Sequence, residues 1–143
     1  MTLPDDVINP RHAIQLTTGH FVVCHGSRVR GDAVHRVCLL SDDVTQIVHT
    51  HGGQRGSDTG QYDVPCSLAV DDNEFVFVAD LNNGRVTLLS PTLNYIRQVV
   101  SRDKLKWFPD RLHLDVQRRR LYVNDNARKD GKGIKGRVVV FSV

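Results

Sequence analysis

The chain of 143 residues repeats one pattern three times, and this repetition limits its fold more than any other feature. The pattern is clearest from Pro65, in PCSLAVDDNEFVFVADLNNGRVTLLSP. It returns from Pro109, in PDRLHLDVQRRRLYVNDNARKDGKGIKGRVVVFSV, and in a more divergent form from Pro10, in PRHAIQLTTGHFVVCHGSRVRGDAVHRVCLLS. Each copy offers a proline, an apolar segment, a polar turn, a second apolar segment, a loop, and a third apolar segment that begins near Arg-Val.

The apolar segments are short and rich in Val, Ile, Phe and Tyr, and none keeps a 3.6-residue period, so we expect strands rather than helices. The expected first strands are 13–16, 68–70 and 112–116, and the expected second strands are 21–24, 75–79 and 121–123. The expected third strands are 36–40, 85–89 and 137–143, with a fourth at 46–49 and 96–100 in the first two copies. The sequence therefore predicts an all-β chain of roughly eleven strands.

Four antiparallel strands in each repeat of about 40 to 55 residues are typical of the blades of a β-propeller. The alternative is a β-sandwich with hairpins at similar spacing, but the matching proline and Arg-Val positions favour the propeller. We expect one propeller segment over residues 1–143, with blades at about 10–54, 63–104 and 109–143. The last of these stops after its third strand.

The phrase P-x-x-L-A-V-D…V-F-V-A-D-x-x-N-x-R-V in the second copy resembles the NHL repeat. The preceding GGQRGSDTGQYDVP and the later LYVNDN…GRVVVF carry the same resemblance. The first copy departs from it, because His25 stands where the others have Asp80 and Asp125. The resemblance implies a six-bladed ring, of which three blades are half. We therefore expect a fragment of a longer propeller, a homodimer that completes a six-bladed ring, or a larger open assembly, with residues 1–9 as a candidate donor of the missing strand.

The charges separate when they are assigned to the two ends of such a propeller. Connections between second and third strands and between blades share one end, where nine basic residues face Asp32, Asp58, Asp103 and Asp130. The nine are Arg28, Arg30, Arg55, Lys104, Lys106, Arg128, Lys129, Lys132 and Lys135. The opposite end is acidic apart from Arg118, Arg119 and Arg120, which we expect to form local ion pairs in a hairpin turn. The formal net charge of +3 is thus concentrated at one end.

A basic surface with aromatic residues nearby is typical of proteins that bind single-stranded RNA or another anionic partner. Trp107, Phe108 and Tyr62 lie near the basic connections, and some NHL propellers of the tripartite-motif class bind RNA through such a surface. The alternative is that the loops are only solvated and that Trp107 and Phe108 pack between blades. The sequence predicts a non-catalytic platform for a protein or RNA partner, without a cofactor.

The other function considered is a metal-containing propeller enzyme, lyase-like or hydrolase-like, with its site in the central channel. His49 and His51 share one face of a strand, and His12 and His113 lie on expected inner strands. Some lyases that resemble NHL propellers bind metal through histidines around the central channel. No third ligand and no nucleophile motif accompanies these residues. The recurring pairs Asp80 with Arg85 and Asp125 with Arg137 are interpreted as structural.

The remaining composition predicts a cytoplasmic protein. Cys24, Cys38 and Cys66 lack a Cys-x-x-Cys spacing, so we expect reduced and buried thiols. No apolar stretch has the length of a membrane helix, and the N-terminal residues lack the apolar core of a secretory signal.

Overall fold

The computed structural model describes residues 2–27, 34–127 and 135–143, and these form eleven strands and one short 3-10 turn. The strands of the first repeat are β1 (Pro10–Gln15), β2 (Phe21–His25), β3 (Val34–Leu40) and β4 (Ile47–Gln54). Those of the second are β5 (Pro65–Val70), β6 (Val76–Asp80), β7 (Arg85–Leu89) and β8 (Tyr95–Val100). The turn η1 (Arg102–Lys104) precedes β9 (Phe108–Asp115), β10 (Arg120–Asn126) and β11 (Gly136–Ser142). The predicted all-β class is confirmed.

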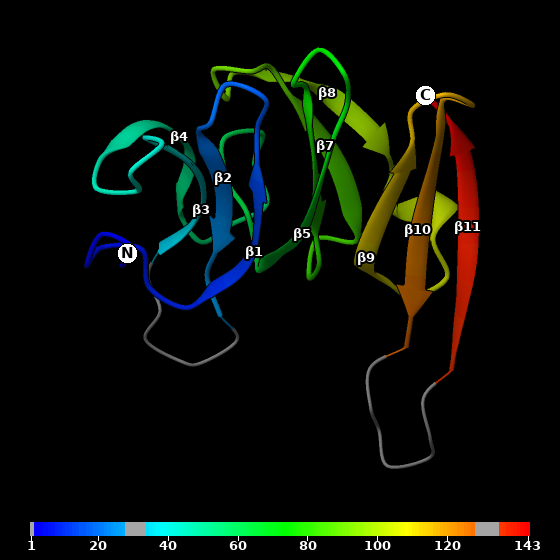
Figure 1. Cartoon of the computed structure of the whole chain (residues 1–143). Helices are drawn as coiled ribbons and strands as arrows, with labels where there is room; N and C mark the ends of the chain where they lie inside the picture. The colour runs from blue at the N-terminus through cyan, green and yellow to red at the C-terminus, as the bar shows by residue number, and fades with distance from the viewer. Residues whose placement is uncertain (1, 28–33, 128–134) are drawn as a thin grey trace.

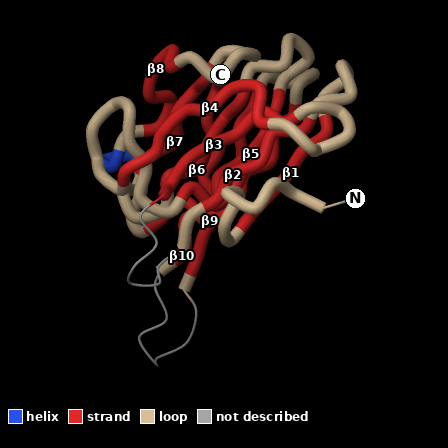
Figure 2. Tube along the Cα trace, turned by 90° about the vertical axis from the view of Figure 1, so that its left-hand side faces the viewer, coloured by secondary structure: helices blue, strands red, loops and turns tan. Residues whose placement is uncertain are grey.

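The strands form three antiparallel sheets, one for each repeat. The first sheet has the order β1-β2-β3-β4 and the second β5-β6-β7-β8, whereas the third contains β9, β10 and β11. The three sheets stand side by side in chain order, with the second between the other two (Figure 1). The tube view from the side shows the strands of neighbouring sheets running at similar inclinations (Figure 2). Each repeat therefore forms its own sheet, and the last sheet has three strands, as expected.

Several strands are longer than the sequence pattern suggests. β1, β5 and β9 begin at or next to the recurring prolines, and β4 continues to Gln54 rather than ending at His49. Gly52 makes this extension of β4 possible. Its φ is +93°, and a Cβ there would lie 2.7 Å from the carbonyl oxygen of His35 on the neighbouring strand. A residue without a side chain therefore keeps β4 in register with the start of β3.

Two apolar clusters join the sheets. Val22, Cys24 and Val37 of the first sheet pack with Leu68 and Val78 of the second. The second cluster lies between the second and third sheets and contains Ala69, Phe77, Val86, Val100, Leu105, Leu121 and Val123. Since each buried side chain of this kind contributes about 1.5 to 3 kcal/mol when removed from water, these contacts are the main source of cohesion between the sheets.

The N-terminal residues lie against the outer face of the first sheet. Val7 packs with Val23, Cys38 and Leu40 in a separate apolar cluster. Within this single chain the described residues 2–9 add no strand to the third sheet, which contains β9, β10 and β11. The apolar side chains of Leu3 and Val7 pack instead against the first sheet, which is the nearest one.

Candidate functional site

The loop end of the molecule is the end where second strands connect to third strands and where one sheet connects to the next (Figure 1, lower end). In each sheet a side chain that accepts hydrogen bonds lies at this end of the second strand. An arginine near the start of the third strand donates to it. The ion pairs are Asp80 with Arg85, at 2.8 Å, and Asp125 with Arg137, at 2.9 Å. In the first sheet the Nε of Arg36 donates to the Nε2 of His25 at 2.8 Å. The pairing that the sequence suggests for two repeats thus exists in all three.

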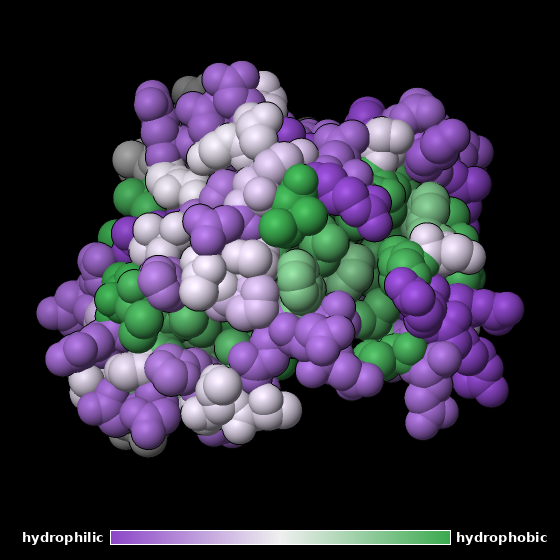
Figure 3. All heavy atoms as spheres, turned by 90° about the horizontal axis from the view of Figure 1, so that it is seen from above, coloured by the Kyte–Doolittle hydropathy of each residue, from purple (hydrophilic) through white to green (hydrophobic). Residues whose placement is uncertain are grey.

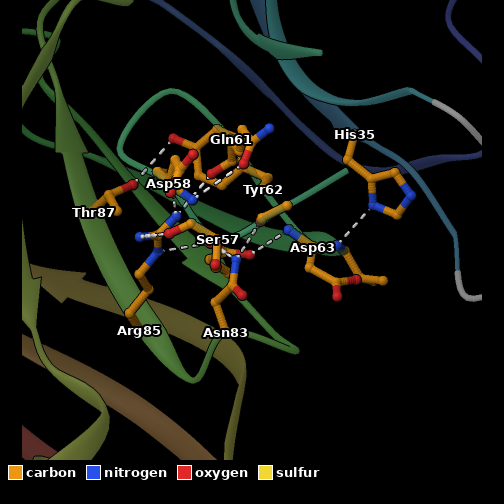
Figure 4. A network of polar contacts seen from close by, with 12 residues as sticks. His35, Ser57, Asp58, Gln61, Tyr62, Asp63, Asn83, Arg85 and Thr87 are labelled. Carbon is orange, nitrogen blue, oxygen red and sulfur yellow. Dashed lines mark hydrogen bonds and ion pairs between the residues drawn. The ribbon is translucent and has the colours of Figure 1, made fainter. Parts of the chain in front are cut away.

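The pair in the second sheet organises the connector before it, residues 55–64 (Figure 4). Asp80 is fully buried and accepts from the backbone N–H of Asp63 and from the side chain of Asn83, each at 2.8 Å. Arg85 donates in turn to the carbonyl oxygens of Ser57, Asp58 and Gln61, at 2.8–3.1 Å. Burial raises the pKa of Asp80 to about 6, against the lowering effects of Asn83, the Asp63 N–H and Arg85. Both carboxylate oxygens of Asp80 and all three guanidinium nitrogens of Arg85 thus make hydrogen bonds within the protein.

The third sheet has the same kind of buried aspartate, Asp125, and this residue holds a different connector, residues 101–107. The carboxylate of Asp125 accepts from the backbone N–H groups of Lys106 and Trp107, each at 2.7 Å. Burial acts to raise the pKa of Asp125, but these two N–H groups and Arg137 outweigh it and lower the pKa below its usual value. The connector 101–107 is therefore held at two consecutive peptide groups, which fixes the backbone from which the Lys106 and Trp107 side chains project.

The first sheet uses a histidine in the same place. His25 is fully buried, and its Nδ1 lies 3.0 Å from the carbonyl oxygen of Ile8, so Nδ1 carries the proton while Nε2 accepts from Arg36. Arg36 also pairs with the carboxylate of Asp6 at 2.9 Å. Burial, together with the charge of Arg36, lowers the pKa of His25. A neutral imidazole thus holds the N-terminal segment, as a carboxylate holds the connectors of the other two sheets.

The nine basic residues predicted for this end do not all remain available to a ligand. Among the described ones, Arg55 pairs with Asp63 at 2.9 Å and Lys104 lies 3.6 Å from Asp103. Lys106 and Lys135 are exposed. The other five predicted residues, Arg28, Arg30, Arg128, Lys129 and Lys132, lie outside the described residues.

Of the aromatic residues near this end, Tyr62 is a core residue, whereas Trp107 and Phe108 are half-buried, and Phe108 packs against the apolar cluster of Val64, Cys66, Ala79 and Leu81. Tyr62 is 1% exposed, and its hydroxyl lies 3.1 Å from the Oγ1 of Thr87, so its expected place on the binding surface is wrong. Its ring joins the apolar cluster between the first two sheets because the connector folds inward there. Trp107 is half-buried, with the Nζ of Lys106 4.8 Å from its ring centroid. The guanidinium of Arg102, a residue outside the nine predicted basic residues, lies 5.1 Å from the ring centroid of Phe108.

Removal of the Tyr62 hydroxyl tests this assignment. Tyr62→Phe is expected to lower the free energy of unfolding by about 1 kcal/mol, because the buried hydroxyl of Thr87 loses its partner. Adding Thr87→Val should recover part of that loss, since the second polar group is then removed as well. Chemical denaturation of the three variants provides the measurement. A full additive loss in the double variant would contradict the role given to this bond.

The opposite end of the molecule is seen in Figure 3, where hydrophobic side chains reach the surface in the middle of a polar rim. A cavity of about 330 Å³ lies here between the second and third sheets. Its lining residues are Asp71, Asp72, Asn73, Phe77, Leu114, Val116, Arg119 and Val143. Asp71 accepts from the N–H groups of Asn73 and Phe75 and so shapes its own turn. Arg118 pairs with Asp115 at 3.0 Å, which confirms the predicted local ion pair in this hairpin.

The histidines considered as metal ligands make other contacts or are exposed. The Nδ1 of His12 accepts from the backbone N–H of Leu68 at 2.9 Å, and the ring of His113 lies against that of Tyr122. His51 lies between Tyr62 and Tyr95, whereas His49 is exposed. Within the described ranges, no group of three or more His, Cys, Asp or Glu side chains is arranged to hold a metal ion.

The three cysteines are free and buried, as expected. Burial raises the pKa of the Cys38 thiol to about 11 and that of the Cys66 thiol to about 12, and it also raises the pKa of Cys24. Thiols with raised pKa values are poor nucleophiles near neutral pH, so their role here is packing. The part of the chain that the structure describes contains no helix with the length and hydrophobicity needed to cross a membrane.

Comparison with known proteins supports the fold and leaves the function open. No family model matches the chain, and no curated protein matches it. A solved structure of a protein of unknown function from Bacteroides caccae is similar, with a TM-score of 0.65 and 18% sequence identity. The similarity covers 91% of this chain and 44% of that protein, so the chain spans less than half the length of its structural neighbour. At this identity the likeness concerns the fold alone.

Proposed function

We propose that the chain is half of a six-bladed NHL-type propeller and serves as a non-catalytic interaction module. Three arguments support the arrangement: the three consecutive sheets, the recurring pairs at the loop end, and the structural similarity to less than half of a longer chain. The assignment to the NHL class rests on the repeat phrase around Asp80 and Arg85. The homodimer that completes a ring is part of this proposal.

The proposed ligand is single-stranded RNA, bound at the loop end of the third sheet. The observation that carries this proposal is the half-buried Trp107 with the Lys106 ammonium over its ring, held by two hydrogen bonds to Asp125. An aromatic ring fixed by its backbone is a suitable platform for a base, because stacking contributes about 1 to 3 kcal/mol per base. Lys106 and Lys135 supply positive charge for the phosphates.

Trp107 allows a direct test, since it is the only tryptophan of the chain. Titration with an oligouridine is expected to quench its fluorescence, with an affinity that falls steeply as the salt concentration rises. Lys106→Ala should weaken binding about three- to tenfold and make the salt dependence less steep by about one phosphate contact. Arg120→Ala, an exposed arginine at the opposite end, is the charge-matched control and should leave the affinity unchanged.

Two further measurements separate the outcomes. Replacement of Arg128, Lys129, Lys132 and Lys135 together by Ala is expected to weaken binding of fluorescein-labelled oligouridine strongly. Absence of quenching together with absence of an anisotropy change would contradict the RNA proposal. If the Lys106→Ala and Arg120→Ala variants lost affinity equally, the binding would be non-specific attraction by net charge.

A further inference from the structure

The turn between β6 and β7 contains Asn83 followed by Gly84, the only Asn-Gly pair of the chain. Such a pair undergoes deamidation more readily than other asparagine-containing pairs, because glycine has no Cβ to keep its peptide nitrogen away from the asparagine side chain. The nitrogen of Gly84, after it loses its proton, attacks the Cγ of Asn83 and expels ammonia, which forms a succinimide. Water then opens this ring to aspartate or isoaspartate, so a neutral side chain becomes an anion.

The folded turn keeps both reacting groups engaged. The Nδ2 of Asn83 donates to the carbonyl oxygen of Gly56 at 2.9 Å and to the carboxylate of Asp80 at 2.8 Å, so the side chain points toward the connector 55–64 (Figure 4). The N–H of Gly84 donates to the carbonyl oxygen of Leu81 at 3.2 Å. Formation of the succinimide requires the Cγ of Asn83 to rotate toward the nitrogen of Gly84. These three hydrogen bonds oppose that rotation, so the intact turn slows the reaction.

The turn has a structural need for both residues of this labile pair. Gly84 has a φ of +63°, and a Cβ there would collide with the side chain of Arg102. Asn83 supplies the amide that joins the buried Asp80 to the carbonyl oxygen of Gly56. The turn therefore favours the residue pair that is chemically least stable.

The products of deamidation do not fit the turn. The reaction replaces the donor of Asn83 by an oxygen that would face the fully buried carboxylate of Asp80 and the carbonyl oxygen of Gly56. Two carboxylates at hydrogen-bond distance cannot both be ionised, so one must bind a proton or move away. Isoaspartate also adds a methylene group to the main chain, which would shift Arg85 from its place opposite Asp80.

A second connector depends on the same turn. The side chain of Arg102 lies over Gly84, and its Nη1 donates to the carbonyl oxygen of Trp107 at 2.7 Å. Asp80 and Arg102 thus tie the turn to the connectors 55–64 and 101–107. Opening of the turn is therefore expected to loosen both connectors at once.

We propose that Asn83 is a deamidation site that the folded turn suppresses, and that conversion of Asn83 in the opened turn prevents the turn from closing again. The reaction consumes solvent water and releases ammonia, so it requires no enzyme or cofactor. A brief opening is reversible, whereas an opening that lasts long enough for the succinimide to form becomes permanent. The proposal rests on residues 80–85 and their contacts, and not on RNA binding or on the propeller arrangement.

Peptide mapping by mass spectrometry tests the suppression. Conversion of Asn83 is followed in the folded chain and in urea at the same mildly alkaline pH. It is expected to be slower in the folded chain by about tenfold or more, because it proceeds only from the locally opened state. Arg85→Lys removes the hydrogen bonds that only a guanidinium can make and should speed conversion in the folded chain but not in urea. Arg118→Lys, which changes a 70% exposed side chain in another turn, is the matched control and should leave both rates unchanged.

Refolding measures the consequence of the reaction. A chain held in urea until Asn83 is converted should not regain its native circular dichroism spectrum. Asn83→Ser keeps a hydroxyl donor and cannot form a succinimide, so this variant should refold after the same treatment. Equal rates of conversion in the folded and unfolded chain, no conversion in either, or full refolding of the converted chain would each overturn the proposal.

The aspartate product can also be introduced directly. Asn83→Asp is expected to speed hydrogen exchange in the connector 55–64 by about tenfold, since the connector then opens more often. Asn94→Asp makes the same change at an exposed position of the turn between β7 and β8 and should leave that exchange unchanged. Failure of Asn83→Asp alone to fold would support the same conclusion, whereas exchange equal to that of the parent would contradict it.

Discussion

Asp80→Ala is expected to lower the free energy of unfolding by about 3 to 5 kcal/mol, the largest effect of any single substitution proposed for this protein. The carboxylate is fully buried and accepts from the Asp63 N–H, from Asn83 and from Arg85. Its removal leaves a guanidinium that is 13% exposed without its counter-ion and frees a buried peptide N–H. The connector 55–64 loses its anchor at the same time, because Arg85 also holds three of its carbonyl oxygens.

A control substitution shows whether the loss of stability is specific to the buried pair of Asp80 and Arg85 or would follow from removing any ion pair. Asp115→Ala removes the partner of Arg118, whose side chain is 70% exposed, and is expected to cost about 1 kcal/mol or less. Urea denaturation of both variants gives the comparison. Equal losses for Asp80→Ala and Asp115→Ala would show that the recurring pair at the loop end is not a structural anchor.

Acidification from about pH 7 to pH 5 is expected to remove roughly 1 kcal/mol of stability through His25. Burial and Arg36 lower the pKa of His25 in the folded chain, so below its ordinary value of 6.5 the unfolded chain binds more protons than the folded chain. Stability from this group is therefore fully present above about pH 6.5 and is lost as the pH falls. A proton on Nε2 would also face the guanidinium of Arg36, which should loosen residues 4–9 in hydrogen exchange.

Other groups titrate in the same range, so the measurement is a difference between variants. Burial lowers the pKa of His12 and of His51, which adds to the loss on acidification. The raised pKa of Asp80 acts in the opposite direction, because its contribution to stability increases as the pH falls through about 6. His25→Asn keeps a donor for Ile8 and an acceptor for Arg36 without the titration, and thermal melts should show a smaller pH dependence. His49→Asn, at an exposed position, should retain the dependence of the parent. Identical pH profiles for His25→Asn and the parent would contradict the assignment.

The strands and the pairs at the loop end could be predicted from the sequence because both depend on short-range patterns. Runs such as Val76–Asp80 show their strand character locally, and the recurrence of Asp80 with Arg85 and of Asp125 with Arg137 follows from their equivalent places across a strand connection. The third member of this set was harder to recognise. His25 is a different residue type from the two aspartates. Only its contacts with Arg36 and Ile8 show that it likewise pairs with an arginine and holds the segment that precedes its sheet.

The candidate site could be predicted only in part. Lys106 and Trp107 were expected at the basic end, but their mutual contact and the support from Asp125 depend on how the connector folds back onto β10. Arg55 and Lys104 looked equally basic in the sequence, yet each lies beside an aspartate. Tyr62 was expected at the surface, but it is buried because its connector turns into the cluster between the first two sheets.

The sequence by itself determined that the chain is built of short strands, that they recur in three units, and that an aspartate and an arginine meet at one end of two of these units. These features follow from side-chain alternation and turn chemistry, which act over a few residues. Only the tertiary structure decided which charges are neutralised, which aromatic ring stays at the surface, and how the amide of Asn83 is held. Those properties depend on contacts between connectors and sheets that are far apart in the chain, and such contacts exist only once the sheets have packed.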